Sequence, residues 1–181
     1  AECDVRDPST INLAGAGAVI YAASGSKQGG SPHEVDNVGV VNAAKACVAA
    51  KVPRLVVISS TAVTRPQSLG YKFTDVYGKI MGEKKLGEDG VYAVSASSDL
   101  AYTIIRPGVM GRVAQIEPSS LALADNGADL KVSPITHAAV AQLCASERPH
   151  RHLPPPPPRR LAVCASRRAP RKTLRDCRAR G

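Results

Sequence analysis

The chain has 181 residues, which is room for one domain, and a formal net charge of +9. Residues 1–146 carry thirteen basic and thirteen acidic side chains, so all of the excess charge lies in residues 147–181. A neutral body excludes a fold built around a broad basic surface, and no run of residues is apolar and long enough to cross a bilayer. The first six residues also lack the basic and apolar segments of a signal peptide.

The first elements in chain order are a short helix and a buried strand. Asp7 is the expected N-cap of the helix, and Pro8 suits its first turn because a proline there loses no hydrogen bond. Residues 18–23 are small, β-branched or aromatic and predict a buried strand, which leads into a loop over residues 24–30.

The clearest local signal is a helix that starts at Ser31. Ser31 and Glu34 form a capping box, with Pro32 at the first helical position. An apolar stripe near the helical period predicts the buried face, and Pro53 ends the helix. The stripe consists of Val35, Val38, Val41, Ala44 and Val48.

Two further apolar runs predict parallel strands. Residues 55–58 are β-branched and form the expected central strand, and residues 102–105 predict a third strand. Residues 75–88 can be helical, although each of three glycines weakens that helix by about 1 kcal/mol relative to alanine. A short edge strand is expected at residues 131–133, before a helix that begins near Thr136.

This alternation predicts an α/β fold, a doubly wound parallel sheet over residues 1–146. A Ser- and Ala-rich stretch at residues 91–99 resembles an insertion and suggests no function.

The pattern stops after about Ala145. Residues 147–181 hold ten of the fifteen arginines and half of the prolines, so we expect a disordered tail. Three accounts of the tail stay open. It is a basic arm for nucleic acid or an anionic surface, although it lacks the interleaved aromatic residues that stack on bases. It is a proline-rich ligand for a partner. Or it derives from a shifted reading frame, since a GC-rich message yields Arg, Pro, Ala and Cys out of frame. Nucleic-acid binding is the least expected of the roles.

The five cysteines are odd in number, far apart and without a CxxC pair. Neither a metal site nor a disulfide framework is indicated. This usage is typical of a soluble protein in a reducing compartment, such as the cytosol, the nucleus or the interior of an organelle.

Chemistry is expected where the strands end, because ligands of open α/β sheets bind outside the carboxyl ends of the strands. The segments after the three apolar runs are residues 22–25, 59–61 and 106–108. Small residues in the first let a ligand approach the backbone, and hydroxyls in the second offer donors and acceptors. The same residues also fit ordinary turns at strand ends.

Six short segments carry a family resemblance that covers about residues 3–143. They are DVRDP (4–8), VIYAASG (19–25), VDNVGVVNAAKA (35–46), VPRLVVISS (52–60), KIMGEKKL (79–86) and YTIIRPG (102–108). Together they resemble the atypical short-chain dehydrogenase/reductase family, in particular its small NAD(P)H-binding, flavin-reductase-like members of bacteria and plastids. The resemblance implies a Rossmann fold that is partial here, because the first strand-helix-strand unit and its GxxGxxG turn have no counterpart. It also implies a cytoplasmic or organellar protein, with the plastid as one candidate.

The resemblance implies a dinucleotide site. Asp4 and Val5 would line the adenine pocket, Asn42 would stabilise the active-site backbone, and Lys79 would hold the hydroxyls of the nicotinamide ribose. Without the resemblance, Asp4 also fits a solvated strand end, and Asn42 and Lys79 fit polar positions on a helix surface.

The other implied contacts come from strand ends. Ala22, Ala23 and Gly25 would pack beside the cofactor ribose, and Pro107 with Gly108 would present backbone to the carboxamide. The implied cofactor-binding residues are Asp4, Val5, Ala22, Ala23, Ser24, Gly25, Asn42, Ser59, Lys79, Arg106, Pro107 and Gly108.

The implied catalytic residues are Ser60, Lys79 and Tyr77. Ser59 and Ser60 end the strand where the family's catalytic hydroxyl sits. The YxxxK pair of the better-known dehydrogenases is missing, because Tyr77 lies two residues before Lys79 and the position four before it holds Asp75. Tyr71 or Tyr77 would have to serve from the loop instead.

The resemblance therefore implies an NAD(P)-binding oxidoreductase-like protein. Its reaction would be hydride transfer from NAD(P)H to a flavin, a quinone or a small carbonyl. NADP is preferred over NAD as the cofactor. Without the glycine-rich turn we expect the chain alone to bind a dinucleotide poorly. The alternative is a non-catalytic Rossmann-like scaffold or redox-sensing assembly protein. The oligomeric state is left open.

Overall fold

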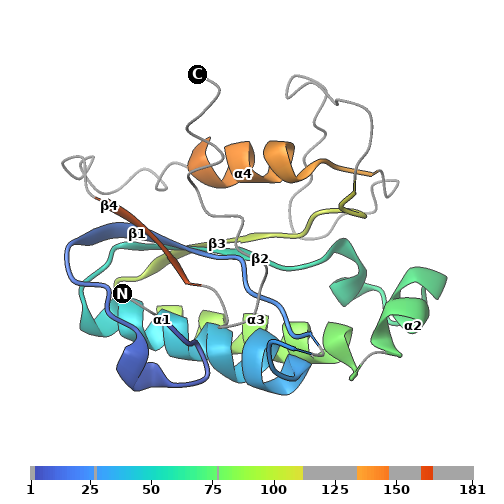
Figure 1. Cartoon of the computed structure of the whole chain (residues 1–181), viewed down its shortest axis with the longest axis horizontal. Helices are drawn as coiled ribbons and strands as arrows, with labels where there is room; N and C mark the ends of the chain where they lie inside the picture. The colour runs from blue at the N-terminus through green and yellow to red at the C-terminus, as the bar shows by residue number, and fades with distance from the viewer. Residues whose placement is uncertain (1–2, 27, 77, 112–133, 147–159, 165–181) are drawn as a thin grey trace.

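The computed structural model describes residues 3–26, 28–76, 78–111, 134–146 and 160–164. These residues contain a parallel sheet of four strands with helices on both faces, which confirms the expected α/β fold (Figure 1). In sheet order the strands are β3 (Ala101–Ile105), β2 (Arg54–Ile58), β1 (Ala16–Tyr21) and β4 (Arg160–Cys164).

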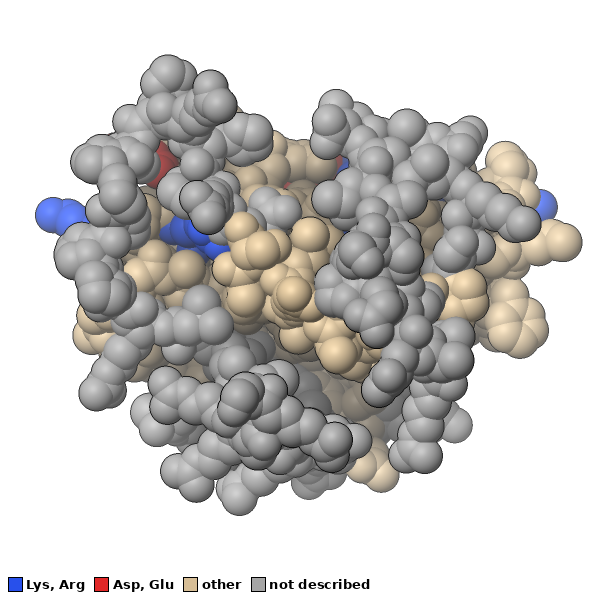
Figure 2. All heavy atoms as spheres, turned by 90° about the horizontal axis from the view of Figure 1, so that it is seen from above, with Lys and Arg blue, Asp and Glu red and all other residues tan. Residues whose placement is uncertain are grey.

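Two helices pack on one face of the sheet and one on the other. α1 (Val40–Ala49) and α3 (Ile80–Ala96) lie below the sheet in Figure 1, and α4 (His137–Ser146) lies above it. The helix expected near Thr136 is thus confirmed as α4. Seen from the α4 side, the visible described surface shows lysine and arginine in separate places rather than as one continuous patch (Figure 2).

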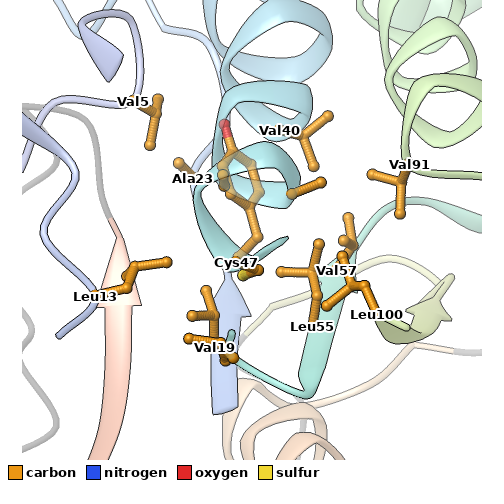
Figure 3. Packing of buried hydrophobic residues seen from close by; sticks show 14 of the residues in the cluster. Val5, Leu13, Val19, Ala23, Val40, Cys47, Leu55, Val57, Val91 and Leu100 are labelled. Atoms are coloured by element: carbon orange, nitrogen blue, oxygen red, sulfur yellow. The ribbon is translucent and has the colours of Figure 1, made fainter. Parts of the chain in front are cut away.

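Side chains of the central strand β2 alternate between two apolar clusters, as the period of two in a strand requires. Leu55 and Val57 join the larger cluster under α1 and α3, with Val19 and Val40 among its members (Figure 3). Val56 points to the opposite face and packs in the smaller cluster with α4. The apolar run of β2 is therefore buried on both sides, as its β-branched composition predicts.

The helix start at Ser31 has the predicted capping box. The Ser31 backbone N–H donates to the Glu34 carboxylate at 2.8 Å, and the Glu34 N–H donates to the Ser31 hydroxyl at 3.2 Å. The predicted buried stripe is only partly right, because Val38 and Val48 are 40% and 39% exposed. The first turns form a π-helix, η2 (His33–Gly39). Its wider turn rotates the following helix, so that the buried face of α1 is Val40, Ala43, Ala44 and Cys47.

The helix expected at residues 75–88 begins only at Ile80, as α3, and a separate helix precedes it. α2 (Leu69–Asp75) ends before a break in which Gly78 and Lys79 have φ angles of +58° and +57°. The Asp75 carboxylate then caps α3, because it accepts a hydrogen bond from the Met81 N–H at 3.0 Å. Residues 91–96 continue α3 and are not an insertion-like stretch, which corrects that interpretation.

Two short 3₁₀ helices complete the described elements before α2. η1 (Pro8–Thr10) is capped as predicted, since the Asp7 carboxylate accepts from the Ser9 N–H at 3.0 Å. η3 (Thr61–Thr64) follows β2 directly.

Of residues 147–181 the structure describes only residues 160–164. Arg160–Cys164 forms β4, which pairs in parallel with β1 rather than being disordered. The edge strand expected at residues 131–133 lies outside the described residues. None of the described helices combines the length and the apolar character that crossing a membrane requires.

Candidate active site at the strand ends

The carboxyl ends of the strands bring the predicted segments together. The Ser59 N–H donates to the Ile105 carbonyl at 2.7 Å, and the Thr61 N–H donates to the Pro107 carbonyl at 3.0 Å. The turn after β2 is thereby held against the turn after β3. Since β1 and β2 are parallel neighbours, the segment after β1 leaves the sheet at the same edge.

A small hollow of about 10 Å³ lies at this edge, roughly the space of one water molecule. It is lined by strand-end and helix side chains that are far apart in sequence: Tyr21, Ala23, Asp36, Val40, Val57, Ile58, Ser59, Lys84 and Glu88. The Ser59 hydroxyl oxygen is buried and has no hydrogen-bond partner among the described residues. An unsatisfied buried hydroxyl is costly, and such groups in native folds are typical of functional positions.

Asp36 is the electrostatic centre of the site. Its side chain is fully buried and accepts three hydrogen bonds, from the Ser24 hydroxyl at 2.9 Å, the Gly25 N–H at 2.7 Å and the Lys84 ammonium at 2.5 Å. The carboxylate therefore fixes the turn after β1 and places a lysine beside Ser59. Gly25 is required here for a structural reason, because a Cβ would lie 2.6 Å from the Pro32 nitrogen.

A second buried ion pair closes the other side of the hollow. Arg106 donates to the two carboxylate oxygens of Glu88, from Nε at 3.1 Å and from Nη2 at 2.6 Å. The hydrogen bonds to Glu88 raise the pKa of Arg106 above its usual value. The Glu88 side chain is 1% exposed, so this pair joins α3 to the end of β3 in a largely water-free environment. The guanidinium predicted to bind the cofactor is thus held by α3.

The segment predicted to line the adenine pocket is held by local bonds. Arg6 Nε and Nη2 donate to the two carboxylate oxygens of Asp4, at 3.0 and 2.7 Å, and these bonds raise the pKa of Arg6. Val5 is fully buried in the core. Its carbonyl accepts from the Asn42 amide at 3.0 Å, so Asn42 supports this segment and not the strand ends.

The predicted catalytic residues are not gathered in the hollow. The Ser60 hydroxyl caps η3 by accepting from the Ala62 N–H at 3.4 Å. Lys79 is exposed at the start of α3, and Tyr77 lies outside the described residues. The remaining predicted cofactor residues stand at the strand ends: Ala22 and Ser24 are exposed, Ala23 and Pro107 are buried, and Gly108 is half-buried.

Sequence reasoning missed Asp36, Lys84 and Glu88. The available signal was an acidic residue within an apolar helix and a lysine four residues before a glutamate.

A wider hollow lies where η3, α2 and the start of α3 meet. It has a volume of about 600 Å³ and is open on one side. Val63, Tyr71 and Leu86 give it apolar walls, and Lys79 contributes a cation. Within the described residues, no group of three or more His, Cys, Asp or Glu side chains is placed to hold a metal ion.

Comparison with known proteins shows the family to which the chain belongs. A sequence profile described as NAD(P)H-binding matches residues 1–147. The chain belongs to the NAD(P)H-binding family. The predicted resemblance to atypical short-chain dehydrogenases/reductases is confirmed. Among curated proteins, none matches the chain.

Solved structures share the fold of this NAD(P)H-binding chain. An oxidoreductase from Lactococcus lactis is 25% identical with a TM-score of 0.50, over 61% of this chain and 50% of its own. A Bacillus halodurans protein described as an NAD-dependent epimerase/dehydratase is 19% identical with a TM-score of 0.54, over 78% and 62%. A short-chain dehydrogenase/reductase from Veillonella parvula is 17% identical with a TM-score of 0.53, over 78% and 60%. The chain thus spans between half and two thirds of their lengths.

The polar groups at the strand ends match one half of the family's dinucleotide in their chemistry, while the hollow itself has room for about one water molecule. Ser59 supplies an unpartnered hydroxyl, and Lys84 uses one of its three donors on Asp36, both beside the small residue Ala23. The diphosphate half does not fit in the same way. Among the described residues, the only GxG sequence, Gly15 to Gly17, enters β1 rather than linking a strand to a helix N-terminus.

Proposed function

We propose that the carboxyl ends of β1, β2 and β3 seat the nicotinamide and ribose half of a reduced dinucleotide, with one polar group of the ligand bonded to Ser59 at the small hollow, and that the whole protein is an NAD(P)H-dependent reductase. The observation that carries the proposal is the Ser59 hydroxyl, buried and unpartnered in a hollow that also contains Lys84. A buried hydroxyl without a partner is costly, so a water molecule or a polar group of a ligand is expected to bond Ser59 at the hollow.

Each residue of the hollow has a role in this proposal. The Ser59 hydroxyl both donates and accepts, so it can orient a carboxamide or a sugar hydroxyl. Lys84 supplies positive potential and two N–H donors that make no bond within the described structure, while Asp36 fixes its position. The bound nicotinamide would supply the hydride, and the protein supplies orientation and electrostatics.

The acceptor enters from the wider hollow. Its apolar walls favour a flat, weakly polar molecule, such as a flavin, a quinone or a small carbonyl compound, and η3, which contributes Val63, follows β2 directly. NADP is the preferred form of the cofactor, a preference that rests on the family resemblance alone.

The test is to measure the oxidation of NADPH and of NADH in the presence of each acceptor class, using the loss of nicotinamide absorbance as the readout. We expect Ser59→Ala to lower the rate about tenfold or more, because a positioned hydroxyl is lost. Ser97→Ala is the matched control, since the Ser97 hydroxyl bonds only carbonyls of its own helix end. Equal rates in the two variants would refute the role of Ser59. Binding without oxidation would favour the non-catalytic scaffold.

A further inference from the structure

One helix carries an apolar face that nothing in the described structure covers. α2 projects beyond the sheet at the right of Figure 1. Leu69 and Phe73 are 85% exposed, and Val76 is 84% exposed. Phe73 is the only phenylalanine of the chain. Exposed clusters of large apolar side chains mark interaction sites.

The spacing of these residues separates an outer face from an inner face. Leu69, Lys72, Phe73 and Val76 follow the helical intervals of three and four residues and share the outer side. Tyr71 lines the wider hollow, and Asp75 caps α3 through the Met81 N–H, so both belong to the inner side. The inner contacts hold α2 in place without using any of the three apolar side chains.

The charge around α2 favours an anionic partner. Asp75 is the only acidic residue between positions 60 and 80, and it is turned toward α3. Lys72 lies on the outer face and is exposed. A lysine beside leucine and phenylalanine can bury its aliphatic stem while its ammonium stays in water, which suits a lipid headgroup layer.

The apolar face of α2 is smaller than the surface that a stable protein–protein interface buries. A stable protein interface buries about 800 Å² per partner, from about 20–30 residues. Three side chains on the seven-residue helix α2 cover much less than that. Interfacial membrane binding has no such minimum area, because its strength scales with the apolar area buried and with the attraction of basic side chains to anionic lipids.

We infer that α2 docks on an anionic phospholipid surface, with Leu69, Phe73 and Val76 inserted among the headgroups and Lys72 on a lipid phosphate. The protein would then lie on the membrane rather than span it. The wider hollow, lined by Tyr71 of the same helix, would open next to the lipid.

The test uses the absence of tryptophan from the chain. Phe73→Trp places one fluorophore on the face, and Val48→Trp places one on α1, at a position that is 39% exposed. With vesicles of phosphatidylcholine and phosphatidylglycerol in equal amounts, we expect a blue shift and protection from acrylamide at position 73 and neither effect at position 48. Adding Leu69→Glu to the Phe73→Trp chain should abolish the shift.

Three outcomes would overturn the inference. The first is no change at position 73 while the protein sediments with the vesicles, since binding then comes from the basic tail. The second is an equal shift at both positions. The third is a blue shift at position 73 without lipid that grows with protein concentration, because the occupant of the face is then a second copy of the chain.

Discussion

Asp36 is the residue on which the strand-end site depends most. Replacing it with asparagine leaves the Lys84 ammonium, whose side chain is 12% exposed, without its counter-charge. We expect Asp36→Asn to lower the free energy of unfolding by about 3–5 kcal/mol, measured by urea denaturation. Asp89→Asn is the control, since its pair with Lys85 is half exposed and contributes less than about 0.5 kcal/mol. Equal losses in the two variants would mean that the buried pair has no special weight.

Cys47 gives a prediction that depends on pH. Burial raises the pKa of its thiol from 9.0 to about 12, because the thiolate is disfavoured in the core. The folded protein should therefore resist alkylation at Cys47 up to about pH 9, as measured by mass spectrometry of the labelled peptide. The raised pKa stabilises the fold fully below pH 9 and loses this effect as the pH rises toward 12. Rapid labelling of native Cys47 at pH 8 would contradict its burial.

The sequence predicts residues whose role is local and misses those whose partners are distant. The Ser31–Glu34 capping box lies within four residues, and the structure has it. The Asp36–Lys84 pair joins positions 48 residues apart, and no local pattern links them. Lys84 and Glu88 look like solvated helix charges until the packing of α3 against η2 turns them inward.

The contact between α3 and η2 depends on one glycine. A Cβ at Gly87 would overlap the Asp36 carbonyl oxygen and would lie 2.6 Å from Val40 Cγ1. We expect Gly87→Ala to force the helices apart and to lower the melting temperature by several degrees, despite the better helix propensity of alanine.

Gly82→Ala is the matched control in the same helix. A Cβ there meets only the Tyr71 hydroxyl oxygen at 3.7 Å, so the substitution should stabilise α3 by up to about 1 kcal/mol. A Gly87→Ala protein that melts at or above the wild-type temperature would contradict the close packing.

The presence of a helix or strand was easier to predict from the sequence than which of its faces is buried. Strands β2 and β3 follow directly from β-branched runs, and α4 begins where expected. The buried stripe of the helix after Ser31 was misplaced because η2 is a π-helix, and a π-turn has no signature in hydrophobic periodicity. The break between α2 and α3 was missed because Lys79 takes a left-handed conformation that is rare for a non-glycine residue.

At the scale of the whole molecule, the sheet order places the site. β2 lies between β3 and β1, so the turns after these strands share one edge, as parallel pairing requires. The fourth strand was not predicted, because the composition of the tail gives no strand pattern. Its five residues supply backbone hydrogen-bonding partners to the outer edge of β1, which would otherwise be an unpaired edge.

The most direct test of the central claim is saturation-transfer-difference NMR with NADPH or NADH, which detects weak binding and reports the part of the ligand that touches the protein. We predict transfer to the nicotinamide ring and its ribose in the wild type and in Ser97→Ala, and its loss in Ser59→Ala. Ser59→Ala should remain at least as stable as the wild type, because the Ser59 hydroxyl has no partner among the described residues. Transfer to neither part of the dinucleotide, or equal transfer in the Ser59→Ala protein, would contradict the assignment of the strand ends around Ser59 as the nicotinamide site.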